Sequence, residues 1–280
     1  MTPHVIVIGG GFAGLRAAVT LADSKVRVTV LESRASLGGR ARSFLDPATG
    51  QIIDNGQHLF LAGYHETVEF LKRLGTDQYL IFQDRLQVAF VEPGGSVRIL
   101  DCPKAPAPLH LLLGIARFSS LSGRDKLSFF RVLRAVAAKT SPEELDTQTV
   151  EEWLTQCGQS AQSRSAFWTP LAIATLNEDP TRASAVGFVS VLQTLLLAPW
   201  SDARLGMACV GLSELYGAAA KGVVEQEGGQ VLLNRPVAEI QIQGSRATGV
   251  RLADGSCLEA DAVVSAVPHR FCLGFFRPPI

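Results

Sequence analysis

The sequence has 280 residues, 47% of them hydrophobic, and its 26 lysine and arginine residues balance its 26 aspartate and glutamate residues. A chain of this length can bury a large core, either as one large domain or as two intertwined ones. Because the charges balance, no overall field favours nucleic acid or an anionic membrane, and we expect no nucleic-acid partner.

Five cysteines are scattered along the chain without a C-x-x-C pair or histidines at metal-ligand spacing. We therefore expect no metal site, no disulfide framework and a reducing, cytoplasmic setting. Because the apolar run that begins at Val5 follows Met1 so closely, we expect no signal peptide. The longest apolar stretches, residues 109–115 and 195–200, are shorter than the roughly 20 residues that a membrane-spanning helix needs.

A glycine-rich turn follows the first predicted strand. Residues 5–8 (VIVI) are an unbroken β-branched run, as expected for a parallel strand buried on both faces. Gly9, Gly11 and Gly14 then give the pattern G-x-G-x-x-G, and apolar residues at helical spacing follow. In such a turn the first glycine permits the tight bend, the second lets the backbone approach a pyrophosphate, and the third lets the helix pack on the strand. The free N–H groups at the start of the helix favour an anion.

The second predicted strand, residues 26–31, ends at Glu32, about twenty residues past the glycines. At this spacing an acidic side chain can accept hydrogen bonds from the ribose hydroxyls of an adenosine. A 2′-phosphate is disfavoured because two negative groups would meet at short range. The first sixty residues therefore predict a dinucleotide site.

The loop after Glu32 reads SRASLGGRARSF, which a plain nicotinamide-binding fold does not need. Gly38 and Gly39 provide a second flexible turn, and the Arg40 guanidinium matches phosphate oxygens. The alternative is that Arg40 and Arg42 belong to a solvated basic loop. The run from VIVIGGGFAGL through LESRASLGGRAR resembles the flavin-dependent amine oxidase and phytoene desaturase superfamily, whose signature is a GxGxxG turn, a strand ending in glutamate and then GGR.

The resemblance implies FAD as the cofactor and an α/β fold in which a Rossmann-type FAD-binding domain carries an inserted, mainly helical α+β substrate domain. The segment D-N-G-Q-H, residues 54–58, stands where the superfamily's chain passes the flavin ring, and its spelling is most similar to hydroxysqualene dehydroxylases. Its alternative is an Asx-type turn. The cofactor-binding residues implied by the resemblance are Gly9, Gly11, Phe12, Ala13, Gly14, Glu32, Ser33, Arg34, Gly38, Gly39, Arg40, Asn55, Gly56, Gln57, His58 and Val237.

The middle of the chain departs from the nucleotide-binding pattern. A helix is expected from Glu66 until Gly75 stops it, and residues 78–101 alternate as antiparallel strands with EPGGS as a hairpin turn. Helices are expected near 109–121, 124–139, 148–157 and 183–197. The sequences SPEE and DTQT, residues 141–144 and 146–149, are helix-entry signals. We assign residues 66–210 to the inserted substrate domain.

From Gly211 on, the sequence returns to the strand and helix patterns of the first sixty residues. Residues 211–229 predict a helix, which is followed by three strands joined by turns and a last apolar strand at 262–266. In the superfamily this block rejoins the flavin domain, which gives 1–65 and 211–280 as FAD-binding segments, with the last strand beside the first. The resemblance places the Val237 backbone at the adenine, although a valine in a strand is usually a packing residue. Complete members continue past the point where this sequence stops, so we expect either a fragment or a shortened protein.

The substrate implied by the resemblance is an isoprenoid, and the reaction is reductive dehydroxylation of hydroxysqualene to squalene. Removal of a hydroxyl group needs an acid, for which His58 is the first candidate and Glu178 or Asp179 the second. A structural, hydrogen-bonded histidine is the alternative for His58. Other interpretations are a carotenoid-type desaturase, an amine oxidase and a nucleotide-binding module without catalysis. A nicotinamide dehydrogenase is a further alternative, but the GGR turn argues against it.

The segment LHLLLGIARFSSL, residues 109–121, has two interpretations. It can be a surface helix that dips into a membrane with Arg117 at the headgroup level, which would make the protein peripheral at the inner membrane face. Alternatively it is a helix packed on the core, as most such apolar stripes are. The redox partner is not indicated by any feature of the sequence.

Overall fold

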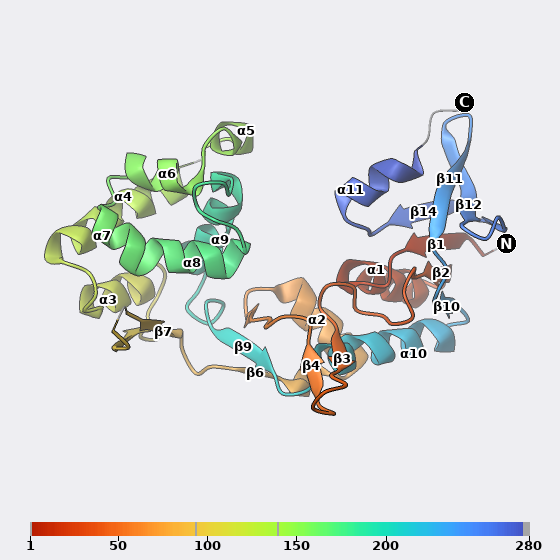
Figure 1. Ribbon diagram of the computed structural model, residues 1–280, viewed down its shortest axis with the longest axis horizontal. Coiled ribbons are helices and arrows are strands. Elements are labelled where there is room, and N and C mark those ends of the chain that lie inside the picture. Colours follow the sequence, from red (N-terminus) through yellow and green to blue (C-terminus); the bar gives the residue numbers. More distant parts are fainter. Residues whose placement is uncertain (1, 93, 139, 277–280) are drawn as a thin grey trace. The chain divides into compact units, whose positions relative to one another are not determined.

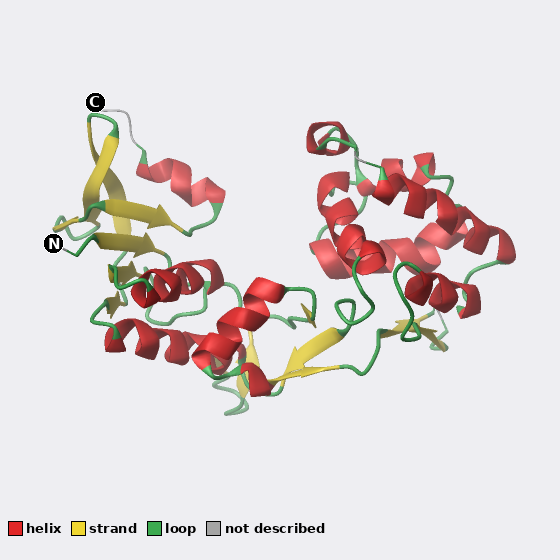
Figure 2. Ribbon diagram, turned by 180° about the vertical axis from the view of Figure 1, so that it is seen from behind, coloured by secondary structure: helices red, strands yellow, loops and turns green. Residues whose placement is uncertain are grey.

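The computed structural model describes residues 2–92, 94–138 and 140–276. The chain divides into two compact units (Figure 1). The first consists of Met1–His58, Glu66–Ile81 and Met207–Ile280, and the second of Leu59–His65 and Phe82–Gly206. The chain is a mixed α/β protein with a parallel sheet in the first unit and most of its helices in the second (Figure 2).

A four-stranded parallel sheet organises the first unit, in the order β10-β2-β1-β14. The strand β1 (His4–Ile8) pairs with β2 (Arg27–Leu31) on one side, and Val5 to Ile8 pair with Ala262 to Ser265 of β14 (Ala262–Ser265) on the other. This confirms the expected return of the chain beside its first strand. The helix α1 (Phe12–Asp23) connects β1 to β2, and β10 (Gln230–Leu232) extends the sheet beyond β2.

Two further layers cover this sheet. The helix α1 packs against α10 (Ala218–Gln226), which continues from the π-helical turn η3 (Ser213–Gly217). An antiparallel sheet consists of β11 (Val237–Gln243), β12 (Arg246–Leu252) and β13 (Cys257–Glu259). Its Ile240 and Val250 share one buried cluster with Ile6 of β1 and Leu31 of β2. The β-branched run of the first strand is therefore buried on both faces, as the sequence predicts.

The helix α2 (His65–Leu74) ends before Gly75, whose φ is +70°, as expected. Residues 66–81 and 207–210 group with the first unit and residues 59–65 with the second, whereas the sequence predicts an insertion that runs from 66 to 210. The physical reason for residues 66–81 is the apolar face of α2, because Phe70 is fully buried with its ring centroid 5.4 Å from that of Phe12 in α1. The hairpin β3 (Ser43–Leu45) and β4 (Ile52–Asp54) and the turn η1 (Asp77–Tyr79) complete this part of the unit.

The second unit contains the predicted hairpin, β7 (Gln87–Val91) and β8 (Val97–Asp101), joined by residues 92–96. Pro93 of the predicted EPGGS turn lies outside the described residues. The hairpin buries Phe90 against Phe118 and Phe167, with ring centroids 5.1 and 5.5 Å away. Short strands lie where the chain passes from one unit to the other, namely β5 (Phe60–Leu61), β6 (Leu80–Phe82) and β9 (Leu205–Ala208).

Helices α3 to α9 form the rest of the second unit around a large apolar cluster. The four expected helices are present as α3 (Leu109–Arg117), α4 (Gly123–Ala137), α6 (Val150–Gln156) and α9 (Ala185–Leu197). The first ends earlier than the expected residue 121 because Phe118 leaves the helix to bury its ring. The helices that the sequence did not indicate are α7 (Ala161–Ser163), η2 (Arg164–Trp168) and α8 (Thr169–Leu176), and the short α11 (His269–Cys272) and η4 (Leu273–Phe275) follow β14.

Side-chain caps begin several of these helices. Ser141 caps α5 (Pro142–Asp146), and Thr149 caps α6 together with Glu152, which confirms both helix-entry signals. Ser122 and Asp125 form a capping box at α4, where Asp125 also accepts a hydrogen bond of 2.6 Å from Ser160 Oγ. All five cysteines are free thiols. No helix within the described part of the chain combines the length and apolarity that crossing a bilayer would require.

Candidate dinucleotide site

The glycine turn between β1 and α1 needs glycine for steric reasons. Gly9 has a φ of +105°, which is unfavourable for residues with a side chain. A Cβ on Gly14 would lie 1.9 Å from the Gly9 carbonyl oxygen, so only glycine allows α1 to approach the end of β1 this closely. These two positions support the roles that the spacing predicts for them.

Gly11 is different because nothing in the protein crowds it. A Cβ built there would have the Cα of Gly39 as its nearest neighbour, 3.8 Å away, which is ordinary van der Waals contact. Gly11 precedes α1 and supplies no side-chain cap, and α1 has no acidic residue in its first turn. The N–H groups of Phe12, Ala13 and Gly14 have no acceptor within the helix. This arrangement is an open cradle for an anionic group, and it fits the pyrophosphate of a dinucleotide.

Glu32 fastens the end of β2 to the glycine turn. Its Oε2 accepts a hydrogen bond of 2.7 Å from the Gly10 N–H, and its Oε1 accepts one of 2.9 Å from the Arg34 N–H. Ser33 Oγ lies 3.2 Å from Oε1. The carboxylate is buried, and Oε2, which has a single donor, keeps a second lone pair that a ribose hydroxyl could use. Glu32 thus has a structural role that the sequence did not reveal, beside the ribose role that remains a prediction.

Residues 33–42 between β2 and β3, which we call the arginine loop, pack against the glycine turn. The Gly38 N–H donates to the Gly10 carbonyl at 2.8 Å, and a Cβ on Gly39 would lie 3.2 Å from the Cα of Gly11. Gly38 and Gly39 have φ values of +111° and +58°, so glycine suits both positions. The two glycine turns therefore lie against each other, as the resemblance implies.

The two arginines of this loop differ. Arg40 is exposed, whereas Arg42 is half-buried and its Nε has no hydrogen-bond partner among the described residues. A buried N–H without an acceptor is costly, and a phosphate oxygen would satisfy it. Arg42 is therefore a candidate phosphate contact, although the cofactor-binding residues implied by the resemblance include Arg40 and not Arg42. The signal was present, because R-A-R offers two guanidinium groups.

Tyr216 of η3 holds the arginine loop from the opposite side. Its hydroxyl lies 2.8 Å from the carbonyl oxygens of both Gly38 and Ala41, to which it donates its proton. The side chain is fully buried, and burial raises the pKa of the phenol well above its usual value. Its ring centroid lies 4.4 Å from that of Phe12. No local sequence signal identifies Tyr216, because its partners lie more than 170 residues away in the chain.

Residues 54–58 (D-N-G-Q-H), which we call the acidic turn, are hydrogen-bonded to the arginine loop. The Asn55 N–H donates to the Arg42 carbonyl at 2.8 Å, and Asn55 Nδ2 donates to the Arg40 carbonyl at 3.2 Å. Asp54 Oδ1 accepts hydrogen bonds from Ser43 Oγ at 2.7 Å and from the Leu212 N–H at 3.0 Å. Asp54 thereby connects the β3–β4 hairpin to the segment that enters η3 and α10.

Gly56, Gln57 and His58 follow on the exposed side of this turn. A Cβ on Gly56 would meet no atom within 4 Å, and Gln57 is exposed. His58 Nδ1 lies 2.7 Å from the Gly56 carbonyl. Because a carbonyl can only accept, Nδ1 carries the proton and donates it, which leaves Nε2 free to bind or release a second proton.

The predicted adenine end lies at the start of β11. Arg235 N–H donates to the Glu32 carbonyl at 2.9 Å, and Asn234 N–H donates to the Arg34 carbonyl at 3.0 Å. Val237 begins β11 two residues later. A cavity of about 340 Å³ adjoins it and is lined by Asn234, Arg235, Pro236, Leu252, Ala253 and Asp254. Val237, Glu32 and the glycine turn are thus parts of one connected region of the first unit.

The second candidate acids lie in the second unit. Hydrogen bonds from the Thr181 hydroxyl and N–H hold the pKa of Asp179 below its usual value, so this carboxylate has no proton to give at neutral pH. Glu178 is exposed and lies 3.7 Å from Arg182. The environment of Asp179 therefore does not favour a proton donor.

The comparisons with known proteins agree with this geometry. The sequence profile of the flavin containing amine oxidoreductase family matches residues 12–271. The chain belongs to this family. Its membership confirms the expected superfamily, and it confirms FAD as the cofactor of an oxidoreductase fold. The open cradle at Gly11 and the unpaired Nε of Arg42 are the features of this flavin-family chain that fit the phosphates of FAD.

Individual relatives refine the comparison. A hydroxysqualene dehydroxylase from Rhodopseudomonas palustris is 30% identical over 274 residues, which cover 96% of this chain and 63% of that protein. A probable zeta-carotene desaturase from Synechococcus elongatus is 28% identical over 287 residues, covering 94% of this chain and 58% of its own. A triple mutant of putrescine oxidase has the same fold, with a TM-score of 0.70 at 19% identity over 95% of this chain and 58% of the other. This family member therefore spans about three fifths of the length of the relatives it matches.

Proposed function

We propose that the chain is the cofactor-binding and substrate-binding part of an FAD-dependent oxidoreductase that converts hydroxysqualene to squalene. The observation that carries the proposal is the 30% identity to a hydroxysqualene dehydroxylase over 96% of the chain. Hydrogen bonds that join Glu32 to Gly10, Gly10 to Gly38, and Arg42 to Asn55 support it, because they connect the three turns that the resemblance assigns to FAD.

In the proposed site Glu32 and Val237 hold the adenosine end, and the glycine turn with Arg40 and Arg42 holds the pyrophosphate. When bound in its reduced form, FAD supplies a hydride equivalent. The protein must then supply a proton, so that the hydroxyl group of the substrate leaves as water. His58 is the proposed donor, since its Nδ1 proton is engaged by Gly56 and its Nε2 can carry the proton that is transferred.

The test of this role is the variant His58→Ala, with His65→Ala, at an exposed histidine of α2, as the control. We expect His58→Ala to bind FAD as the wild type does and to turn over hydroxysqualene slower by about 10²- to 10⁴-fold, the usual contribution of acid–base help. His65→Ala should leave turnover unchanged. Unchanged turnover in His58→Ala would remove His58 from the mechanism.

A carotenoid-type desaturase is the second candidate, supported by the 28% identity to a probable zeta-carotene desaturase. The two reactions differ in the direction of electron flow, because dehydroxylation consumes reduced flavin whereas desaturation consumes oxidised flavin. Mixing the protein with hydroxysqualene under anaerobic, reducing conditions, and separately with zeta-carotene under oxidising conditions, therefore distinguishes them by flavin absorbance. A putrescine arm tests for an amine oxidase, and FAD binding without turnover of any of the three would favour a nucleotide-binding module.

We also propose peripheral contact with a membrane, because an isoprenoid substrate partitions into lipid.

A further inference from the structure

The outer face of the β7–β8 hairpin is unusually apolar for a surface strand pair. Phe90 and Leu100 point into the core, whereas Val91, Val97 and Ile99 are 73%, 56% and 60% exposed. Val91 pairs directly with Val97, and Ile99 pairs with Ala89, which is also exposed. Antiparallel sheets with one solvated face normally place polar side chains on it. A continuous exposed apolar strip of this kind marks an interaction surface.

The helix α3 carries a second exposed apolar strip. Leu109 and Leu113 are 51% and 40% exposed, and Arg117 follows one turn later on the same side of the helix. The opposite side is buried, since His110, Leu111 and Ile115 face the core. Both interpretations of this segment therefore have a basis, because one side of α3 packs on the core and the other does not.

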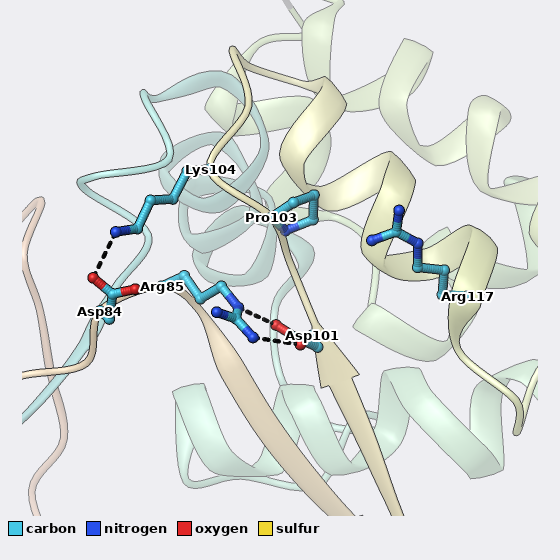
Figure 3. Close-up of a pocket in the computed structure, with 6 residues that line it drawn as sticks. All are labelled: Asp84, Arg85, Asp101, Pro103, Lys104 and Arg117. Carbon is cyan, nitrogen blue, oxygen red and sulfur yellow. Dashed lines mark hydrogen bonds and ion pairs between the residues drawn. The ribbon is translucent and has the colours of Figure 1, made fainter.

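The two strips meet at a charged pocket of about 390 Å³, lined by Asp84, Arg85, Asp101, Pro103, Lys104 and Arg117 (Figure 3). Asp101 lies two residues beyond Ile99 on the same face of β8, and Arg117 lies one turn beyond Leu113. The close approach of α3 to β8 depends on Gly114, where a Cβ would lie 2.5 Å from Cys102 Sγ.

The charges of this pocket do not cancel. Arg85 binds Asp101 through two hydrogen bonds of 2.6 and 2.8 Å, and Lys104 binds Asp84 at 2.6 Å. Arg117 makes no ion pair in the described part of the chain, and in Figure 3 its guanidinium extends from α3 towards Pro103, with no dashed line to Asp101. The pocket therefore has one cation in excess, and this cation has donors to spare.

Lys104 adds a second feature of interfaces. Its ammonium lies 5.4 Å from the ring centroid of Trp200, which is half-buried. Tryptophan is enriched at the headgroup level of membranes because one end of its ring system is apolar and the other can hydrogen-bond. A cation, a tryptophan and two apolar strips thus lie together in the second unit.

We propose that these residues, which we call the hairpin–α3 surface (Val91, Val97, Ile99, Leu109, Leu113 and Arg117), dock on an anionic phospholipid bilayer. The apolar strips enter among the acyl chains and Arg117 binds a lipid phosphate. A bilayer offers phosphate oxygens and hydrocarbon side by side, which is the complement of this surface. The inference rests in part on the proposed function, because an isoprenoid substrate would reach the protein from the lipid phase.

The test is co-sedimentation of the purified chain with vesicles, either of phosphatidylcholine alone or of an equimolar mixture with phosphatidylglycerol. We expect binding to the mixed vesicles that weakens with salt. Val97→Ser combined with Ile99→Ser should lower the partition coefficient at least about tenfold, because the apolar groups that enter the lipid are lost. Arg117→Gln should lower it about fivefold, the usual contribution of one cation near an anionic membrane surface, and should reduce its salt dependence.

Matched controls lie in the first unit. Ile242 on β11 is 51% exposed and Arg246 on β12 is exposed. Ile242→Ser repeats one of the two apolar-to-serine changes, and Arg246→Gln repeats the loss of one cation, both away from the hairpin–α3 surface. Both should bind vesicles like the wild type. Thermal unfolding of each variant checks that the fold is retained.

Several outcomes would overturn the proposal. These are absence of the wild type from the vesicle pellets, equal binding to both vesicle types, unchanged binding of the surface variants, and an equal loss in the controls. A lipid-independent dimer that the double variant abolishes would assign the surface to a second copy. Binding is measured without turnover, so vesicle binding with no dehydroxylation refutes only the proposed function. Dehydroxylation of detergent-dispersed hydroxysqualene without vesicle binding refutes only the docking surface.

Discussion

Tyr216→Phe is the substitution that most directly probes how the arginine loop is held. The phenol oxygen lies 2.8 Å from the carbonyl oxygens of Gly38 and Ala41, on either side of Gly39 and Arg40. Phenylalanine keeps the buried ring and its contact with Phe12, 4.4 Å between centroids, and removes only the donor. Any effect therefore comes from the hydrogen bond to the loop.

The size of the effect follows from what the two carbonyls lose. The Gly38 carbonyl keeps the hydrogen bond of 3.0 Å from the Ala41 N–H, whereas the Ala41 carbonyl loses the Tyr216 hydroxyl. A buried acceptor left without its donor costs about 1–3 kcal/mol. If about 1–2 kcal/mol of the FAD-binding free energy is spent on ordering the loop once this hydrogen bond is lost, the dissociation constant for FAD rises about five- to thirtyfold.

The assay is an FAD titration followed by flavin fluorescence, with the free energy of unfolding measured without FAD alongside. Tyr79→Phe is the matched control, since Tyr79 is 39% exposed and lies in η1, outside the loop. We expect the control to match the wild type. Equal FAD affinity and equal stability of Tyr216→Phe and the wild type would refute the claim that this hydroxyl positions the arginine loop.

Two further substitutions test single carboxylates. Glu32→Gln should weaken FAD binding and lower the free energy of unfolding by about 1–3 kcal/mol, because an amide nitrogen would face one of the N–H donors of Gly10 and Arg34; wild-type values in both titrations would contradict this role. Hydrogen bonds from Ser122, and to a lesser extent from Ser160, hold the pKa of Asp125 in the folded protein below its usual value. The charge of Asp125 therefore stabilises the fold at any pH above the unfolded pKa of about 3.9. This contribution is lost as the pH falls through the lower pKa of the folded protein. Asp125→Asn should therefore lower the free energy of unfolding by about 1–2 kcal/mol at pH 7, with a difference that shrinks in acid, whereas a difference independent of pH in denaturant titrations would show that the charge is not responsible.

The sequence predicted the elements whose cause is local. The β-branched run and the three glycines of the first turn specify a buried strand, a tight bend and a helix with no information from elsewhere in the chain. The caps at Ser141 and Thr149 and the hairpin at 92–96 were predicted for the same reason. Each depends on residues within a few positions of one another.

The missed features depend on contacts between distant segments. The helix α7 begins at a local cap, Ser160, whereas η2 and α8 continue from it without a cap of their own. These two are held by distant partners such as Phe129, whose ring centroid lies 5.3 Å from that of Trp168. The place of α2 is likewise set by Phe70 and its aromatic neighbours. The role of Tyr216 and the unpaired Nε of Arg42 become visible only when the loop is folded.

If the glycine turn and the arginine loop together hold the phosphates of FAD, Gly11→Ala should prevent FAD from binding without disturbing the fold. The protein tolerates the added Cβ, whose nearest neighbour would be 3.8 Å away, and the backbone at Gly11, with φ −82° and ψ −176°, is accessible to alanine. Only a group seated in the cradle would be displaced. We predict an unchanged unfolding temperature without FAD and an FAD affinity lowered at least about tenfold, the equivalent of about 1.4 kcal/mol. Full FAD binding by this correctly folded variant would contradict the account.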